Sequence, residues 1–260
     1  MIYVFLPAYN EEIALRPLVH KIHETLIKLM PYHILILNDG SNDQTETVVL
    51  ELKRDYPITV LSHNINQGLG QTMIDGLNYL AKIATEEDLI VTLDSDNTHE
   101  PNYISIAIQK IRDGYDLVIM SRFQKGGKEI GLSFGRKIMS RGACLFLKIF
   151  FPIKGIRDYS CGFRVFQASA IRRAIQTFDK EFIRLPHLGF VVMCEILIKL
   201  RLLGCRITEI PFILRYDQKP GRSKNNIFRT ILGYFLLVSL YWGKSLKYTA
   251  PLRMNRSDIS

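Results

Sequence analysis

Residues 89–96 of this chain read Leu-Ile-Val-Thr-Leu-Asp-Ser-Asp, and this stretch decides the fold class. Its first five residues form a short, largely apolar run, which is typical of a strand buried inside a sheet. The run stops at Asp94-Ser95-Asp96, where two carboxylates stand one residue apart. Such pairs bind Mg²⁺ or Mn²⁺ together with substrate phosphates, and they also occur in solvated turns. The spacing leaves both interpretations open, and the position after a buried strand favours the metal.

Apolar runs recur on both sides of that stretch and alternate with helical periodicity. They predict further strands at residues 2–6, 34–37, 58–61 and 117–120, and helices at residues 15–29 and 69–83. Strands that alternate with helices predict an α/β fold, with a mostly parallel sheet flanked by helices.

The second half of the chain is less regular. It predicts helices at residues 133–151 and 188–203, a strand at 206–210, and a glycine-rich loop at 126–135 that is a candidate lid. Residues 231–242 are almost wholly apolar and are followed by Lys244 and Lys247. A dozen residues fall short of the ~20 that cross a bilayer. An interfacial helix and a helix packed into the core both fit this run.

Three polar clusters follow predicted strands, at residues 7–12, 38–43 and 94–99. In open α/β sheets, ligands bind beyond the carboxyl ends of the strands. The three clusters therefore predict one shared site.

Net charge and cysteine content indicate the class of binding partner and the cellular compartment, but not a particular ligand. The net charge of +9 over 260 residues favours polyanionic partners, such as phosphorylated molecules or an anionic membrane, although it also serves solubility. The four cysteines form no Cys-x-x-Cys pair and have no metal-ligand spacing with histidine, so we expect buried thiols in a reducing compartment. No basic segment precedes a long apolar core at the start, and a cytoplasmic site of action is the default expectation.

Several motifs in order resemble a known family. Pro-Ala-Tyr-Asn-Glu-Glu at 7–12, Asn-Asp-Gly-Ser at 38–41, Asn-Gln-Gly at 66–68 and the Asp94-Ser95-Asp96 pair resemble family 2 inverting glycosyltransferases, which have the GT-A (nucleotide-diphospho-sugar transferase) fold. Segments 121–123, 136–141, 158–164 and 221–224 resemble the dolichol-phosphate mannose synthase branch. The resemblance covers residues 1–225, which implies a transferase domain there; a membrane-interfacial, apolar helix is expected at 226–250 and a tail at 251–260.

The resemblance also implies roles for individual residues. Asp94 and Asp96 would bind the metal, Mg²⁺ or Mn²⁺, and would act in catalysis together with Arg122 and Arg136. The nucleotide would be bound by Pro7, Tyr9, Glu11, Asp39, Ser95 and Lys224. The chain departs from the family pattern at Thr98, at Ser160-Cys161, and in a longer spacer between Asp217 and Lys224.

The function that follows is metal-dependent, inverting transfer of a sugar from a nucleotide-sugar to a polyprenyl phosphate. The enzyme would associate peripherally with the cytosolic face of an anionic membrane and would not bind nucleic acid. Two alternatives stay open: a same-fold transferase acting on a hydroxyl of a glycan or another cell-envelope acceptor, and a non-catalytic nucleotide- or nucleic-acid-binding module. A hydroxyl acceptor would need a general base, for which Asp158 and Glu195 are candidates.

Overall fold

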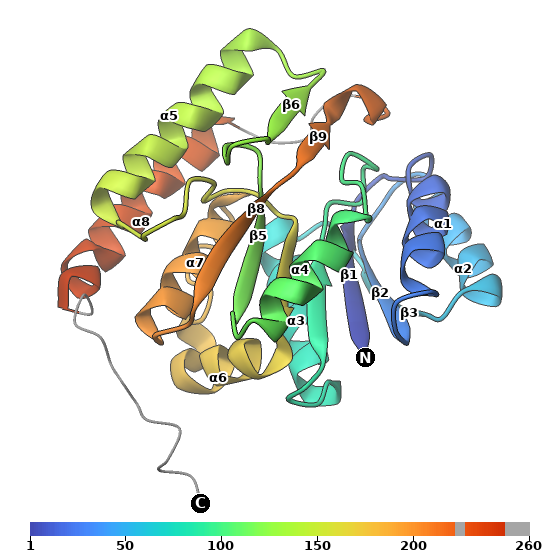
Figure 1. The fold of residues 1–260 in the computed structure, drawn as a ribbon. Helices are drawn as coiled ribbons and strands as arrows, with labels where there is room; N and C mark the ends of the chain where they lie inside the picture. Colours follow the sequence, from blue (N-terminus) through green and yellow to red (C-terminus); the bar gives the residue numbers. More distant parts are fainter. Residues whose placement is uncertain (222–226, 248–260) are drawn as a thin grey trace, which may run out of the picture.

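The computed structural model describes residues 1–221 and 227–247, and in that part of the chain a seven-stranded sheet forms the centre (Figure 1). Its order is β3 (Ile58–His63), β2 (Tyr32–Asp39), β1 (Ile2–Ala8), β4 (Leu89–Thr92), β7 (Arg164–Gln167), β5 (Leu117–Ser121) and β8 (Ile207–Pro211). β7 runs antiparallel to both of its neighbours, and all other pairs are parallel. A parallel pair of β6 (Lys128–Ile130) and β9 (Ile213–Arg215) forms a second, small sheet.

Helices flank the central sheet. They are α1 (Leu15–Leu26), α2 (Thr45–Asp55), α3 (Leu69–Ile83), α4 (Tyr103–Arg112), α5 (Phe134–Phe150), α6 (Ala168–Phe178), α7 (Val191–Leu202) and α8 (Ile227–Lys247), with 3₁₀ turns η1 (Asp179–Glu181) and η2 (Tyr216–Gln218). α5 and α8 lie side by side at the edge farthest from α1 and α2, and α8 also contacts α7 (Figure 1).

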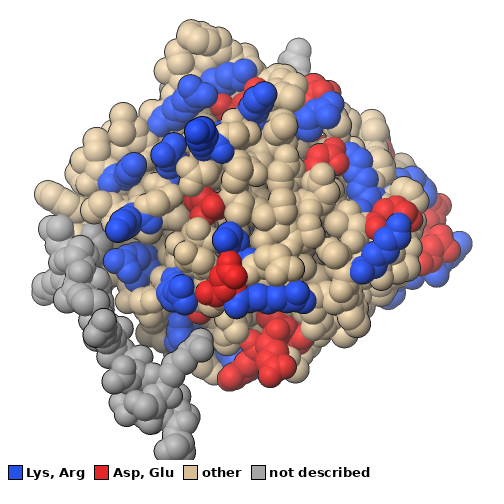
Figure 2. All heavy atoms as spheres, in the orientation of Figure 1, with Lys and Arg blue, Asp and Glu red and all other residues tan. Residues whose placement is uncertain are grey.

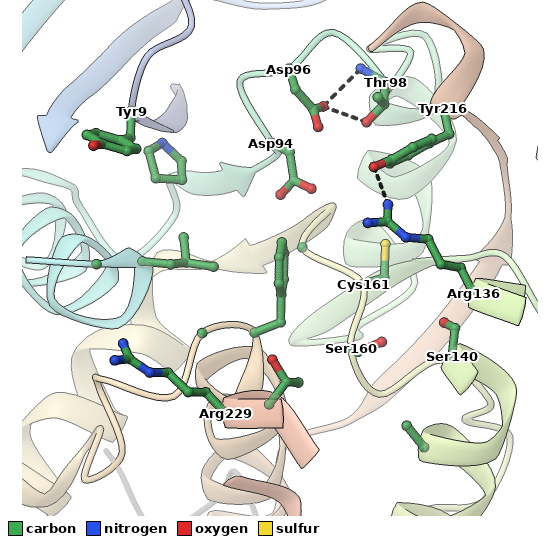
Figure 3. Close-up of a pocket in the computed structure, with 18 of the residues that line it drawn as sticks. Tyr9, Asp94, Asp96, Thr98, Arg136, Ser140, Ser160, Cys161, Tyr216 and Arg229 are labelled. Atoms are coloured by element: carbon green, nitrogen blue, oxygen red, sulfur yellow. Dashed lines mark hydrogen bonds between the residues drawn. The ribbon is translucent and has the colours of Figure 1, made fainter. Parts of the chain in front are cut away.

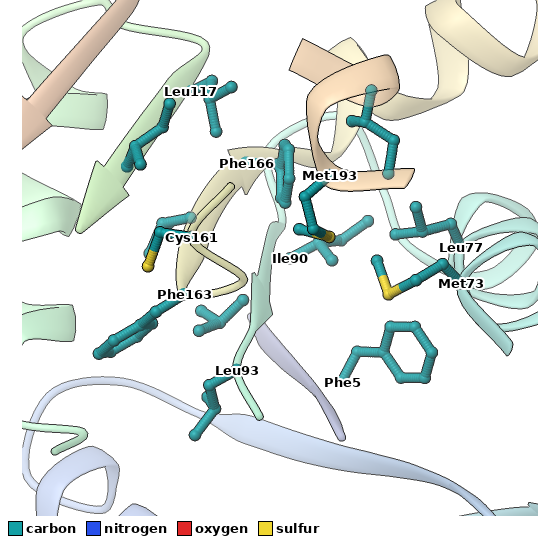
Figure 4. Packing of buried hydrophobic residues seen from close by; sticks show 14 of the residues in the cluster. Phe5, Met73, Leu77, Ile90, Leu93, Leu117, Cys161, Phe163, Phe166 and Met193 are labelled. Carbon is teal, nitrogen blue, oxygen red and sulfur yellow. The ribbon is translucent and has the colours of Figure 1, made fainter. Parts of the chain in front are cut away.

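The core lies between the sheet and these helices. Phe5 of β1 packs with Met73 and Leu77 of α3, and the cluster continues through Phe163, directly before β7, and Phe166 within it (Figure 4). α3 approaches β1 closely because residue 76 is glycine: a Cβ there would lie 2.0 Å from the ring of Phe5. This approach fixes α3, whose first turn borders the site described below.

The predicted α/β fold with a mostly parallel sheet is confirmed, and so are its strands and helices, with shifted ends. The helix predicted at 15–29 ends at Leu26, and the apolar run at 231–242 belongs to the longer α8. The glycine-rich stretch at 126–135 is not simply a loop, because β6 lies within it and pairs with β9. Three-residue strands have too few residues to show a period, which explains why both were missed. Among the described helices, none combines the length and the apolar character needed to cross a membrane.

Candidate active site

A cavity of about 960 Å³ opens where β1, β2 and β4 end, and the predicted site residues converge on it. Those that line it are Pro7, Tyr9, Glu11, Asp39, Asp94, Ser95, Asp96, Arg122 and Arg136. Lys224, the remaining predicted residue, lies outside the described residues, as do the predicted domain boundary at 225 and the tail at 251–260.

Hydrogen bonds tie the three strand-end loops to one another. The amide of Asn10 donates to Ser41 Oγ at 2.9 Å, and the amide of Asn42 donates back to Asn10 Oδ1 at 2.8 Å. Asn10 has a positive φ of 53°, a conformation that asparagine tolerates better than most residues. Ser95 Oγ donates to the carbonyl of Pro7 at 2.8 Å, which links the third loop to the first. This part of the cavity is therefore organised before any ligand arrives.

Asp39 anchors a fourth loop. Its carboxylate accepts hydrogen bonds from the amides of Gln67 and Gly68 at 2.9 and 2.8 Å, and it lies 2.7 Å from Nδ1 of His63. The backbone turns sharply at Gly40, where φ is +64° and a Cβ would lie 2.4 Å from the backbone of Ile65. Asp39 is thus a structural anchor that also lines the cavity, and its contact with a nucleoside stays a prediction.

Asp94 faces the cavity between Tyr9 and Arg136 (Figure 3). Its amide donates to Nδ1 of His99 at 3.1 Å, and Nε2 of the same ring lies 3.8 Å from the Asp94 carboxylate. Gly162 leaves room for that carboxylate, because a Cβ at residue 162 would lie 2.6 Å from Asp94 Oδ1. Burial raises the pKa of Asp94 above its ordinary value, against the opposing effect of His99.

Asp96 is more enclosed, with 11% of its side chain exposed. It accepts hydrogen bonds from the amide and hydroxyl of Thr98 at 3.2 and 2.6 Å, and it forms an ion pair with Lys219. Burial alone would raise the pKa of Asp96, but the Lys219 ammonium, His99 and these hydrogen bonds outweigh burial and lower it. Sequence reasoning missed Lys219, whose one signal was its place in the longer spacer before Lys224.

The two carboxylates suit a divalent cation that arrives with a diphosphate. Within residues 1–221 and 227–247, no group of three or more His, Cys, Asp and Glu side chains is arranged to hold a metal by itself. Mg²⁺ and Mn²⁺ are commonly bound by one or two carboxylates plus substrate phosphates. Asp94 and Asp96 supply that donor set, and the hydroxyl of Thr98 is engaged with Asp96.

Arg122 is held by carboxylates instead of standing free for phosphate. Its guanidinium donates to both oxygens of Asp158, each at 2.7 Å, and to Ser160 Oγ at 2.9 Å. Glu129 of β6 lies 3.7 Å from it. Burial would lower the pKa of Arg122, but Asp158 raises it well above its ordinary value. Arg122 therefore stays charged at the edge of the cavity.

Neither candidate general base is placed for that role. Asp158 is fully buried, and besides Arg122 it accepts the amide of Cys161 at 3.2 Å. Glu195, equally buried, accepts the amides of Arg184 and Leu185 and the hydroxyl of Tyr241. Neither residue lines the cavity. Both hold loops and helices in place, and neither is positioned in this arrangement to act as a base.

The cavity continues from the carboxylates to α5 and α8. Arg136 donates to the hydroxyl of Tyr216 at 2.6 Å, and Ser140 and Arg229 lie farther along (Figure 3). The same two helices also contribute apolar side chains to the lining: Ile138, Met139, Phe146, Tyr234 and Phe235. One cavity thus joins a carboxylate-rich end to cations and apolar side chains of α5 and α8.

Comparison with known proteins agrees with this geometry. The family model described as glycosyl transferase family 2 matches residues 3–176. A dolichol-phosphate mannosyltransferase of Pyrococcus furiosus is 33% identical over 222 residues, which are 85% of this chain and 58% of that protein. An undecaprenyl-phosphate mannosyltransferase of Micrococcus luteus is 26% identical over 94% of both chains.

A solved structure shares the fold. Glucosyl-3-phosphoglycerate synthase of Mycobacterium tuberculosis, crystallised with Mn²⁺, UDP and phosphoglyceric acid, superposes with a TM-score of 0.61 at 20% identity. The match covers 95% of this chain and 77% of that one. At this identity the likeness establishes the fold alone.

Proposed function

Since this chain belongs to glycosyltransferase family 2, as the resemblance predicted, we propose that it transfers a sugar from a nucleotide-sugar to a polyprenyl phosphate. The observation that carries the proposal is the single cavity that joins Asp94 and Asp96 to the apolar surfaces of α5 and α8. A nucleotide-sugar has a phosphate-rich body, and a polyprenyl phosphate has a charged head on an apolar chain. The carboxylate-rich end fits the nucleotide-sugar with its metal. The cations and apolar side chains of α5 and α8 fit the polyprenyl phosphate.

The donor occupies the carboxylate-rich end in this proposal. Tyr9 and Asp39 border the nucleoside, and Asp94 and Asp96 hold a divalent cation against the diphosphate. The cation, Mg²⁺ or Mn²⁺, stabilises the negative charge that develops on the departing nucleoside diphosphate. The names of the relatives in P. furiosus and M. luteus make mannose the first sugar to test.

In this proposal the acceptor phosphate lies beside the cations that line the cavity. Arg136 and Arg229 border that part of the cavity and attract an anionic head group (Figure 3). An oxygen of the acceptor phosphate forms the new bond to the anomeric carbon while the bond to the nucleoside diphosphate breaks, with inversion. That oxygen is already anionic at neutral pH, so the absence of Asp158 and Glu195 from the cavity is consistent with this acceptor.

The lipid chain leaves along α5 and α8, which we propose lie at the cytosolic face of an anionic membrane. One side of each helix is packed: Phe146 lies 5.1 Å from Phe235 and Phe150 lies 5.6 Å from Trp242, centroid to centroid. Other apolar side chains of the pair face outward: Phe134, Leu145, Ile149, Phe228 and Leu232. α5 also carries Arg136, Lys137, Arg141 and Lys148, and Lys and Arg side chains outnumber acidic ones over its part of Figure 2. Apolar surface bordered by cations suits the boundary of an anionic leaflet.

A matrix of donors and acceptors tests the proposal. Nucleotide-sugars, beginning with activated mannose, are each offered with polyprenyl phosphate or with soluble glycans, in Mn²⁺ or Mg²⁺, and the released nucleoside diphosphate is measured. We expect release that depends on polyprenyl phosphate. Release with a glycan alone would favour a hydroxyl acceptor, and no release with any pair would refute transferase activity.

A further inference from the structure

Lys219 is enclosed beside the carboxylate pair. Its side chain is 9% exposed, and its ammonium pairs with Asp96. Glu11 and Asp94 also contribute favourable electrostatic interactions, and together with Asp96 they raise the pKa of Lys219 although burial opposes this. Burying a cation this far is costly unless carboxylates compensate it. In this state Lys219 neutralises the charge that a divalent cation would neutralise.

The backbone that carries Lys219 is tied to the body of the molecule on several sides. The amide of Arg215 donates to the carbonyl of Thr98, two residues after Asp96, at 3.0 Å. Tyr216 accepts from Arg136, and Gln218 accepts from Lys21 of α1 at 3.1 Å. Loop residue Gly131 lies so close that a Cβ there would meet the amide of Asp217 at 2.4 Å. These contacts hold the segment in place, and the long side chain of Lys219 keeps rotatable bonds of its own.

We propose that Lys219 is the resident counter-cation of Asp96, and that its ammonium moves from Asp96 to the donor's diphosphate when a divalent cation binds there. This inference rests on the proposed nucleotide-sugar site. It adds a positioning residue that the family resemblance did not supply, within the spacer where this chain departs from the pattern.

Electrostatics gives the reason for the exchange. An ammonium in contact with Asp96 repels a divalent cation that approaches the same oxygens, so Lys219 weakens metal binding when no nucleotide is present. The diphosphate brings new negative charge to the site. The four-carbon stem of Lys219 lets its ammonium reach that charge and bind it as a point charge. Metal and nucleotide therefore bind best together. The metal takes the place of the Lys219 ammonium at Asp96, and the diphosphate binds the ammonium that the metal displaces.

Two affinities of Lys219→Met test this, and they should change in opposite directions. Mn²⁺ binding without nucleotide, followed by the electron paramagnetic resonance signal of free Mn²⁺, should tighten about tenfold or more because a buried like charge is removed. Binding of GDP or UDP in saturating Mn²⁺, followed by calorimetry, should weaken about tenfold. A residue that merely supported the fold would weaken both.

Three further variants locate the effect. Lys219→Arg keeps the charge and should bind Mn²⁺ as the wild type does. Lys82→Met removes an exposed lysine that does not line the cavity, and it should change neither affinity. Adding Asp96→Asn to Lys219→Met should abolish the gain in Mn²⁺ affinity. Thermal melting checks that each variant is folded.

The outcomes separate this inference from the proposed function. Unchanged or weaker Mn²⁺ binding by folded Lys219→Met would overturn the inference, even in an enzyme that transfers sugar to polyprenyl phosphate. Unchanged nucleotide affinity would also overturn it. If no donor and acceptor react but Lys219→Met gains Mn²⁺ affinity that Asp96→Asn removes, the displacement stands and the proposed function fails.

Discussion

At the scale of single residues, Gly162 shows how one missing side chain shapes the site. The Asp94 carboxylate occupies the space where a Cβ of residue 162 would lie, 2.6 Å from Oδ1. The hydroxyl of Thr92 donates a hydrogen bond to the carbonyl of Gly162 at 2.7 Å. This bond opposes a shift of the backbone away from Asp94. Gly162→Ala should therefore displace Asp94 and reduce transfer by about tenfold or more, a geometric loss of the kind that small misplacements cause.

The matched control is Gly135→Ala, at an exposed position of α5 with nothing within 4 Å of the added Cβ. It should leave the transfer rate unchanged and stabilise the helix by up to about 1 kcal/mol. Equal rates for Gly162→Ala and the wild type would show that Asp94 tolerates the displacement.

Asp96 carries the metal prediction. Asp96→Ala removes one of two carboxylates available to the cation, and transfer should fall by about two orders of magnitude. The fold should persist, because Lys219 has a long stem that can turn its ammonium toward solvent. Circular dichroism measures the fold, and nucleoside diphosphate release measures transfer. EDTA should abolish wild-type transfer, and Mn²⁺ or Mg²⁺ should restore it. A full rate in EDTA would disprove metal dependence.

Asp39 has two roles that one pair of variants can separate. Asp39→Ala removes the acceptor of the Gln67 and Gly68 amides and the predicted partner of the nucleoside. It should weaken nucleoside diphosphate binding by about 1–3 kcal/mol in calorimetry. His63→Ala removes one neighbour of that carboxylate but leaves the carboxylate in place, and it should weaken binding less. An unchanged affinity in Asp39→Ala would leave Asp39 with the structural role alone.

At the scale of elements, α5 and α8 form the surface proposed to meet the membrane. Phe228 at the start of α8 is 85% exposed, and Ile149 on α5 is 67% exposed. Phe228→Glu puts a negative charge on that surface and should reduce sedimentation with anionic vesicles, both by lost apolar contact and by repulsion. The wild type should sediment, and added salt should weaken its binding.

Ile106→Glu is the control for that experiment. Ile106 is also exposed, at 51%, and lies on helix α4 away from the pair. Its substitution should leave vesicle binding unchanged. If the wild type, Phe228→Glu and Ile106→Glu all fail to sediment with the vesicles, the membrane proposal fails. A soluble acceptor then becomes the better hypothesis.

At the scale of the whole molecule, the four cysteines report on the integrity of the core. All four are buried as free thiols: Cys144, Cys161, Cys194 and Cys205. Burial raises the pKa of Cys144 and of Cys205 to about 11, and it raises the pKa of the other two as well. The native protein should therefore react slowly with a thiol reagent at neutral pH, since the thiolate is the reactive form. In denaturant all four should react, and rapid reaction of any thiol in the native protein would contradict this packing.

The sequence by itself determined the α/β class, six of the seven strands of the central sheet, several of the helices and the place of the site, but not β7. These features depend on neighbours within a few positions: apolar runs make strands, a 3.6-residue period makes helices, and polar residues directly after strands mark the ligand edge. Asp94, Asp96 and Asp39 could be selected on this basis because their significance lies in where their own strands end.

Only the tertiary structure decided how the charges are paired. Lys219 lies 123 positions from Asp96 in the chain, and Asp158 lies 36 positions from Arg122. The pairing of β6 with β9, strands of three residues each, has no local period to reveal it. Sequence reasoning considered Asp158 and Glu195 as bases because it could not see the amides and hydroxyls that already occupy them. Charge pairing depends on distance in space, and the sequence encodes that distance only through the packing of the whole chain.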